Sequence, residues 1–125
     1  MNNTDIQKSL QEANDCVPRL SFEEANNLIA TANTLIIDVR ETSEEEATGL
    51  IKNAVNIPKS IIDNNFDHSL IKNYLNKNEG ITILVYCAAG IRSALVGHKL
   101  IKEDYINVFN IGGYAEWLLN EEVNS

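Results

Sequence analysis

Cysteine and positive charge are scarce in this chain of 125 residues, and each scarcity excludes a class of protein. Its two cysteines, Cys16 and Cys87, are too few for a disulfide scaffold, so we expect both to be reduced. Lys and Arg number 10 against 18 Asp and Glu, and the net charge of −8 disfavours binding to nucleic acid or to an anionic membrane. We therefore expect no nucleic-acid partner and no membrane partner.

Long hydrophobic runs, repeats and low-complexity linkers are also absent. No apolar run approaches the ~18–20 residues that a membrane span needs, and the N-terminus lacks the pattern of a secretion signal. The sequence thus predicts a soluble, cytoplasmic protein, which we expect to be a monomer. We divide it into an N-terminal extension, residues 1–17, that is weakly helical or disordered, and a single domain over residues 18–125.

Hydrophobic patterning in this domain predicts strands that alternate with helices. Apolar runs at 35–39 and 81–86 are typical of strands buried on both faces of a parallel sheet, and shorter strands are expected at 54–57 and 108–111. Ser21 and Glu24 have the spacing of a capping box that begins a helix over 22–31. Further helical patterns lie at 67–76, 92–103 and 114–121. The predicted fold class is α/β with a mainly parallel sheet.

The residues after the second long strand indicate a nucleophilic site. Cys87 ends this strand, and a loop into the next helix follows, consisting of Ala88, Ala89, Gly90, Ile91 and Arg92. Ligands of open α/β sheets bind outside the carboxyl ends of the strands, where Cys87 lies. Inward backbone N–H groups and the Arg92 guanidinium would favour the thiolate of Cys87, which makes it a candidate catalytic nucleophile. A structural cysteine at the end of a core strand is the alternative.

Four segments share the order and spacing of a known family: Leu35–Glu41, Gly49 with Ala54–Pro58, Tyr86–Ser93 and Gly112–Trp117. Together they resemble the rhodanese family over about residues 20–121. The resemblance implies a five-stranded, mainly parallel sheet with helices on both faces. It also implies a sulfurtransferase of the thiosulfate sulfurtransferase type, in which Cys87 carries a persulfide and residues 88–92 hold it.

By the same resemblance, the sulfur donor would be a small anion such as thiosulfate, or a protein persulfide. The acceptor would be cyanide or a thiol such as that of a small redox protein, and no cofactor is expected. Ala88 stands where many family members have a basic residue, which we expect to weaken thiosulfate capture. The acidic run Glu44–Glu46 also departs from the family pattern and is expected to be a solvated helix start or loop.

Two alternative functions stay open. One is a rhodanese-like binding or persulfide-carrier module without appreciable turnover of its own. Binding modules of this kind often lose the cysteine, so the presence of Cys87 argues against them, whereas a carrier would load sulfur on Cys87. A phosphatase or arsenate reductase is disfavoured, because those enzymes place arginine six positions after the cysteine, whereas Arg92 is five positions after Cys87.

Other polar residues receive structural interpretations. Asp38 and Arg40 follow the first core strand and are expected at the pocket edge, where an ion pair that orders loops is the favoured role. Cys16 is interpreted as incidental, with a resolving thiol as the alternative. His68 and His98 have no partners at metal-ligand spacing, so no metal site is predicted.

Overall fold

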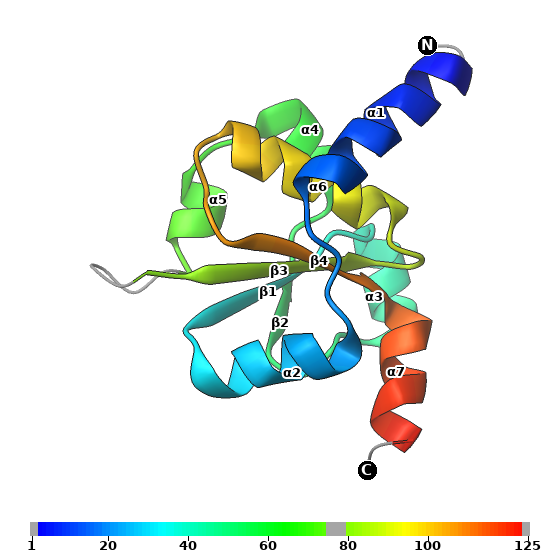
Figure 1. Ribbon diagram of the computed structural model, residues 1–125, viewed down its shortest axis with the longest axis vertical. Coiled ribbons are helices and arrows are strands. Elements are labelled where there is room, and N and C mark those ends of the chain that lie inside the picture. The colour runs from blue at the N-terminus through cyan, green and yellow to red at the C-terminus, as the bar shows by residue number, and fades with distance from the viewer. Residues whose placement is uncertain (1–2, 75–79, 124–125) are drawn as a thin grey trace.

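The computed structural model describes residues 3–74 and 80–123, which form a parallel sheet between two layers of helices (Figure 1). The strand order is β2-β1-β3-β4, and all three pairings are parallel. The strands are β1 (Thr34–Asp38), β2 (Ala54–Asn56), β3 (Thr82–Cys87) and β4 (Val108–Gly113). The predicted α/β fold with a parallel sheet is therefore confirmed.

The helices cover both faces of the sheet (Figure 1). They are α1 (Asn3–Cys16), α2 (Phe22–Thr31), α3 (Thr42–Thr48), α4 (Lys59–Asn65), α5 (Ser69–Lys72), α6 (Ile91–Lys102) and α7 (Tyr114–Val123). The patterns at 22–31, 92–103 and 114–121 correspond to α2, α6 and α7. Of the pattern at 67–76, the structure shows only the short α5, and residues 75–76 lie outside the described part of the chain.

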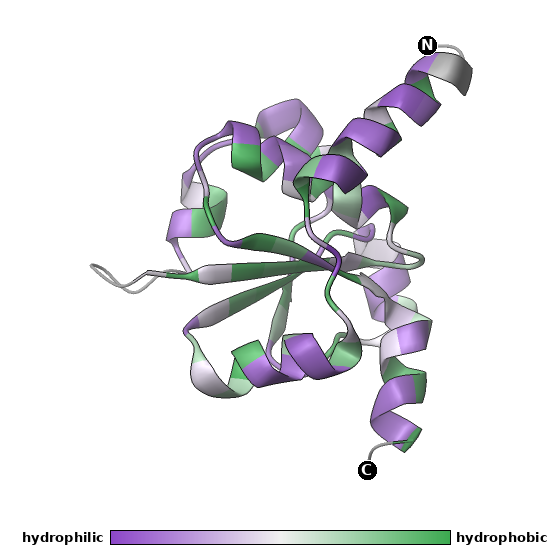
Figure 2. Ribbon diagram, viewed as in Figure 1, coloured by the Kyte–Doolittle hydropathy of each residue, from purple (hydrophilic) through white to green (hydrophobic). Residues whose placement is uncertain are grey.

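Alternating side chains of the central strand β3 divide the core into two clusters. Ile83, Val85 and Cys87 face the cluster that includes residues of α4, α5 and α6. Leu84 and Tyr86 face the cluster that includes residues of α2 and α7. Figure 2 shows the result as hydrophobic strands between helices whose outer surfaces are hydrophilic. Because strand side chains alternate between faces, this register places the Cys87 side chain on the α6 side of the sheet.

The expectation of a fifth strand is wrong for the described residues, in which the sheet has four. The segment between α1 and α2 runs beside β4 but pairs with it only at Arg19, which forms an isolated parallel bridge to Asn110. Two features limit this pairing. Pro18 has no N–H to donate, and the N-cap of α2 at Ser21 follows within three residues.

The N-terminal helix α1 packs against α6, and its first turn extends away from the domain (Figure 1). Ala13 and Val17 are buried at this contact. A Cβ atom added to Gly97 of α6 would lie 2.9 Å from Cγ1 of Val17. The absence of a side chain at Gly97 is therefore what lets the end of the extension approach α6.

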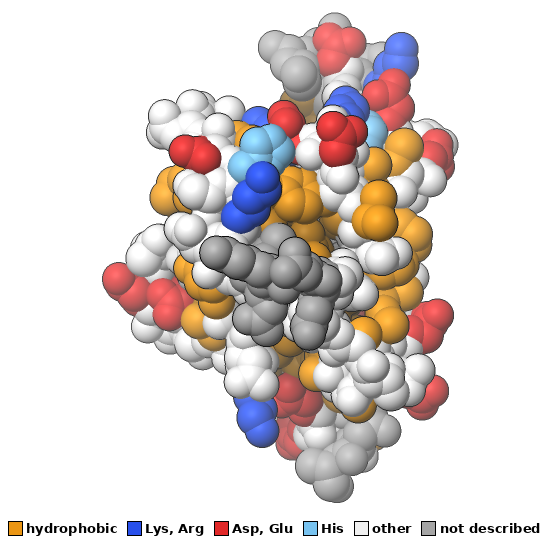
Figure 3. Space-filling view, turned by 90° about the vertical axis from the view of Figure 1, so that its left-hand side faces the viewer, with side chains coloured by type: hydrophobic (Ala, Val, Ile, Leu, Met, Phe, Trp, Pro, Cys, Tyr) orange, Lys and Arg blue, Asp and Glu red, His pale blue; other side chains and the backbone are white. Residues whose placement is uncertain are grey.

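The carboxyl ends of the strands point to the right in Figure 1, where α3 and the start of α7 also lie. Figure 3 looks at the opposite edge, where the strands begin. That edge shows hydrophobic surface between groups of charged side chains of both signs. Cys87 ends β3 and therefore lies on the side of the molecule that faces away from this view.

Candidate active site

Cys87 is the last residue of β3, and α6 begins only four residues later. Gly90 is the N-cap of α6 and has a left-handed backbone with φ of 96°. Side chains other than glycine are strained in this conformation, so Gly90 allows the short connection between the strand and the helix. The helix therefore starts directly beside the thiol.

The Cys87 sulfur is buried and surrounded by hydrogen-bond donors. Its residue is 1% exposed, and the Gly90 N–H donates to Sγ at 3.0 Å. The Ser93 hydroxyl lies 3.4 Å from the same sulfur. A sulfur that accepts these bonds is stabilised as an anion more than as a neutral thiol.

The pKa of Cys87 is lowered by this environment. Burial, the largest single influence, raises the pKa, because it disfavours the charged form. The Ser93 hydroxyl and the backbone N–H groups of Ser93, Ala89 and Gly90 act in the other direction, and together they outweigh burial. The geometry thus favours the thiolate, which is the reactive form of a cysteine.

Asn110 of β4 holds this donor arrangement in place. Its Nδ2 donates to the Gly90 carbonyl at 3.0 Å, while its Oδ1 accepts from Ser93 Oγ at 2.8 Å and from the Gly112 N–H at 2.9 Å. Asn110 and Ser93 are both buried. The amide therefore connects the Cys87 loop, the first turn of α6 and the end of β4 to one another.

A β-bulge accompanies this network at the carboxyl end of the sheet. Val85 pairs with Asn110 and Tyr86 pairs with Gly112, so Ile111 is the extra residue in β4. Bulges redirect side chains and are frequent beside active sites. Here the bulge lets the Asn110 side chain bond to Gly112 of its own strand while it also reaches the Cys87 loop.

The Arg92 guanidinium is paired with Glu44 of α3. Its Nη1 and Nη2 donate to the two carboxylate oxygens at 2.6 and 2.9 Å. The hydrogen bond from Arg92 is the main reason that the pKa of Glu44 falls to about 2, against the opposing effect of burial. Both side chains are charged at neutral pH, so the positive charge beside the loop is already balanced by a carboxylate.

The outer surface of the loop is apolar. Ala88 and Ala89 are exposed, and Ile91 is 55% exposed. A second guanidinium, that of Arg19, packs against the loop at Gly90 and also pairs with Glu116 at 3.0 Å. A reagent that approaches the buried sulfur therefore passes an apolar rim, and the two nearby arginines both have carboxylate partners.

Asp38 and Arg40 form a buried ion pair at the same edge of the sheet. Arg40 Nη2 lies 2.7 Å from the Asp38 carboxylate, and the two side chains are 0% and 3% exposed. Arg40 also donates to Thr48 Oγ1 and to the Gly49 carbonyl, each at 2.8 Å. These contacts fasten the end of α3 to the sheet, as in the loop-ordering role, and none of them involves Cys87.

Three of these functional candidates were not singled out as site residues from the sequence: Glu44, Ser93 and Asn110. Ser93 adjoins the predicted loop, and Asn110 is the one polar residue in an apolar strand, which is a detectable signal. Glu44 has no such signal. It belongs to an acidic run, and only the fold brings α3 beside α6.

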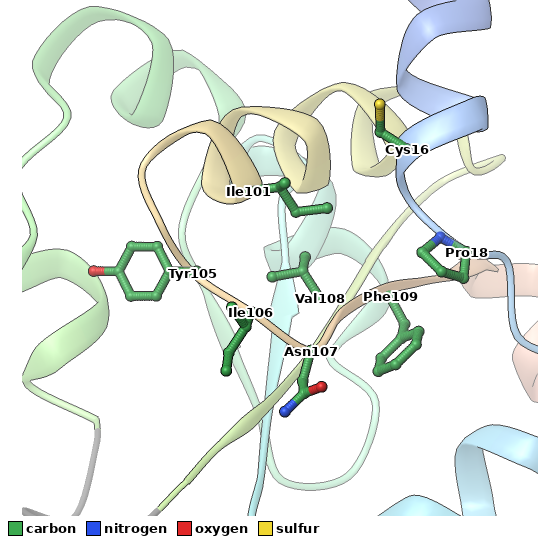
Figure 4. Close-up of a pocket in the computed structure, with 8 residues that line it drawn as sticks. All are labelled: Cys16, Pro18, Ile101, Tyr105, Ile106, Asn107, Val108 and Phe109. Atoms are coloured by element: carbon green, nitrogen blue, oxygen red, sulfur yellow. The ribbon is translucent and has the colours of Figure 1, made fainter.

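The second cysteine lies elsewhere. Cys16 is exposed at an open hollow of about 350 Å³ between the end of α1, the end of α6 and β4 (Figure 4). Ile101, Tyr105 and Val108 contribute to its mostly apolar lining. No residue of the Cys87 loop lines this hollow, so the two cysteines belong to separate surfaces.

Residues 3–74 and 80–123 contain neither a candidate metal site nor a candidate membrane-spanning helix. The structure shows no group of three or more His, Cys, Asp or Glu side chains there that could hold a metal ion. Nor does it show a helix long and apolar enough to cross a membrane.

Comparison with known families identifies the family of this chain. The family model described as a rhodanese-like domain matches residues 21–120. The chain belongs to the rhodanese-like family. The match begins at Ser21, so α1 of this rhodanese-like chain lies outside the matched residues.

Solved structures share this rhodanese-like fold. A rhodanese-like domain protein from Staphylococcus aureus is 33% identical, with a TM-score of 0.60 over 81% of this chain and 91% of that one. A human single-domain sulfurtransferase is 24% identical, with a TM-score of 0.65 over 82% of this chain and 96% of that one. A Rhodopseudomonas palustris protein of unknown function, described as a possible tyrosine phosphatase, has a TM-score of 0.79 at 22% identity and covers 97% and 94% of the two chains. The last two likenesses, below 25% identity, show the fold alone.

Curated relatives match only through part of their length. The tRNA uridine(34) hydroxylase of Photorhabdus laumondii is 26% identical over 99 residues, which are 78% of this chain and 27% of the relative. The hydroxylase of the same name from Buchnera aphidicola is 26% identical over 109 residues, or 85% of this chain and 33% of the relative. The chain thus spans about a quarter to a third of these relatives.

Proposed function

We propose that the protein is a sulfurtransferase in which Cys87 carries the transferred sulfur as a persulfide. The observation that carries this proposal is the position of the Cys87 sulfur, which is buried at the start of α6 and accepts a 3.0 Å hydrogen bond from the Gly90 N–H. A thiolate held in this way is a nucleophile at neutral pH. Membership in the rhodanese-like family supports the same chemistry.

The proposed reaction has two steps. The Cys87 thiolate attacks the sulfane sulfur of the donor, a new S–S bond forms, and the donor's own bond to that sulfur breaks, so the remainder leaves with the electron pair. The terminal sulfur of the persulfide is then attacked by an acceptor, either cyanide or a thiolate, and Cys87 is regenerated as a thiolate. The donor product leaves before the acceptor reacts, so ping-pong kinetics follow.

The loop would stabilise the intermediate electrostatically. The backbone N–H groups at the start of α6 and the positive end of its dipole lie beside Sγ, where the anionic sulfur of the persulfide would also lie. The short loop between Cys87 and Arg92 is better matched to one sulfur atom than to a tetrahedral oxyanion. This geometry favours sulfur transfer over phosphatase chemistry.

A persulfide carrier that works only with a protein partner is the second candidate. The burial of Cys87 supports it, because a sulfur that is 1% exposed is reached less readily by free reagents than an exposed one. Such a carrier would load sulfur on Cys87 but would turn over thiosulfate and cyanide slowly.

The test compares wild type with Cys87→Ser, and with Cys16→Ser as a matched control on the other surface. Thiosulfate-to-cyanide transfer is measured, and intact mass spectrometry after donor exposure detects one added sulfur. We expect wild type and Cys16→Ser to gain the sulfur and Cys87→Ser to gain none. Loading without turnover supports the carrier. No added sulfur from thiosulfate or a persulfide, in folded protein with free Cys87, refutes both candidates.

A further inference from the structure

The charges around the Cys87 loop affect which sulfur donors can bind there and react with Cys87. Arg92, the cation at the end of the loop, has both terminal nitrogens bonded to Glu44 at 2.6 and 2.9 Å. Arg19, which packs against Gly90, is paired with Glu116. Each positive charge at the loop is thus matched by a carboxylate, and the chain as a whole carries a net charge of −8.

The pairing of Arg92 with Glu44 is firm. The bond is bidentate, which is the strongest geometry for an arginine and a carboxylate, and the pKa of Glu44 falls to about 2. Glu44 is further fixed in α3 by a hydrogen bond from the Glu41 N–H at 3.2 Å. The carboxylate occupies two of the five N–H groups of Arg92 and balances its charge, which weakens the attraction of the guanidinium for a dianionic donor.

The entrance to the sulfur offers apolar contact instead. Ala88, Ala89 and Ile91 form the exposed rim of the loop. Exposed apolar side chains at the edge of a site contribute to binding when a ligand covers them, because apolar surface leaves water. A doubly charged donor gains little from such a rim, whereas a donor with an apolar substituent gains from it.

We propose that Glu44 is a specificity-determining residue. By occupying the Arg92 guanidinium, it disfavours the thiosulfate dianion and leaves an apolar entrance suited to a singly charged sulfur donor with an apolar substituent, such as an organic thiosulfonate or an organic persulfide. This inference rests on the persulfide chemistry of Cys87 proposed above.

The loading step balances for both classes of donor. With a thiosulfonate, the Cys87 thiolate bonds to the sulfane sulfur, the bond between that sulfur and the sulfonyl sulfur breaks, and a sulfinate leaves with the electron pair. With thiosulfate, sulfite leaves in the same way. One persulfide anion and one leaving anion form in each case, and no external oxidant or proton is consumed.

The experiment measures the rate constants for loading Cys87 from thiosulfate and from benzenethiosulfonate. Intact mass spectrometry follows the added sulfur in wild type, Glu44→Gln and Glu45→Gln. Glu45 lies on the same helix, so its replacement makes the same change in net charge one residue away and serves as the matched control. Glutamine at position 44 keeps an acceptor oxygen for the Glu41 N–H, and thermal unfolding checks that each variant is folded.

The quantity compared is the ratio of the thiosulfate constant to the benzenethiosulfonate constant. Any change in Cys87 reactivity affects both donors and cancels in this ratio. We expect Glu44→Gln to raise the ratio about tenfold, because an unpaired guanidinium a few ångströms from the loop attracts a dianion more than a monoanion. Glu45→Gln is expected to change it about twofold or less, because Arg92 keeps both of its bonds to Glu44 in this variant.

An unchanged ratio in Glu44→Gln would overturn the proposal, as would an equal rise in both variants, which would indicate a general effect of net charge. If neither donor adds sulfur to Cys87 in wild type or in either variant, it is the sulfurtransferase function itself that fails. The two failures are therefore distinguishable.

Discussion

Ser93 has one hydroxyl proton and two acceptors at hydrogen-bond distance, Asn110 Oδ1 at 2.8 Å and Cys87 Sγ at 3.4 Å. When Cys87 is a thiol, its S–H can donate to Ser93, and Ser93 can donate to Asn110. When Cys87 is a thiolate, the hydroxyl can turn to the sulfur. Asn110 Oδ1 then still accepts from the Gly112 N–H, so the rotation leaves no buried acceptor without a partner.

Ser93→Ala is accordingly expected to raise the pKa of Cys87, because a donor to the anionic form is lost while burial is unchanged. A raised pKa means less thiolate at neutral pH, so alkylation at pH 7 should slow several-fold and its pH profile should move to higher pH. Iodoacetamide alkylation in a Cys16→Ser background reports on Cys87 alone. Ser69→Ala, at an exposed position on α5, is the matched control. An identical pH profile in Ser93→Ala would mean that the hydroxyl stays on Asn110 in both states.

Single residues also show where sequence reasoning ends. The candidate nucleophile could be selected from the sequence, because Cys87 ends a strongly apolar run and small residues follow it. The pairing of Glu44 with Arg92 was not, because it joins positions 48 residues apart through the packing of two helices. Local patterns contain no information about which of three consecutive glutamates faces the loop.

Among the secondary-structure elements, those that could be predicted have long hydrophobic patterns and recognisable residues at their ends. The capping box at Ser21 and Glu24 is present, and α2 begins at Phe22 as predicted. By contrast, α4 was not predicted, because its seven residues are too short to repeat an apolar pattern. The segment beside β4 forms one bridge in place of the expected fifth strand, because Pro18 has no N–H to donate and the N-cap of α2 follows at Ser21.

The contact between α1 and α6 depends on Gly97, and it yields a prediction about stability. Gly97→Ala should gain about 1 kcal/mol from helix propensity. Its new Cβ would lie 2.9 Å from Val17 Cγ1, however, and overpacking costs roughly 1–3 kcal/mol. We expect a net loss of about 1 kcal/mol in the free energy of unfolding, measured with urea.

Val17→Ala provides the matching background for this experiment. With the valine methyl groups removed, the Cβ at position 97 has room, so Gly97→Ala should raise the free energy of unfolding by about 0.5–1 kcal/mol relative to Val17→Ala alone. The sign of the effect thus reverses between the two backgrounds, as expected for residues in direct contact. Equal effects in both backgrounds would show that the end of the N-terminal extension does not pack on α6 in solution.

At the scale of the whole molecule, the net charge of −8 bears on whether this chain alone can bind tRNA. The curated relatives described above are tRNA uridine(34) hydroxylases, of which the chain spans about a quarter to a third. Binding to a polyphosphate backbone requires Lys and Arg side chains that replace condensed counterions. Here Arg92 and Arg19, the arginines at the loop, are both paired with carboxylates.

We therefore predict that the isolated chain does not bind tRNA at about 0.15 M salt, where the Debye length is about 8 Å and no long-range attraction is available. Fluorescence anisotropy of labelled tRNA, titrated with the protein, should stay flat. Lowering the salt should not produce binding, because repulsion between two polyanions grows as screening falls. Binding that strengthens as salt is removed would contradict the prediction and would reveal a local cationic surface. The proposed sulfur transfer at Cys87 requires the loop, its hydrogen-bond donors and a sulfur donor but no tRNA, so we expect the rate of sulfur loading to be the same with and without tRNA.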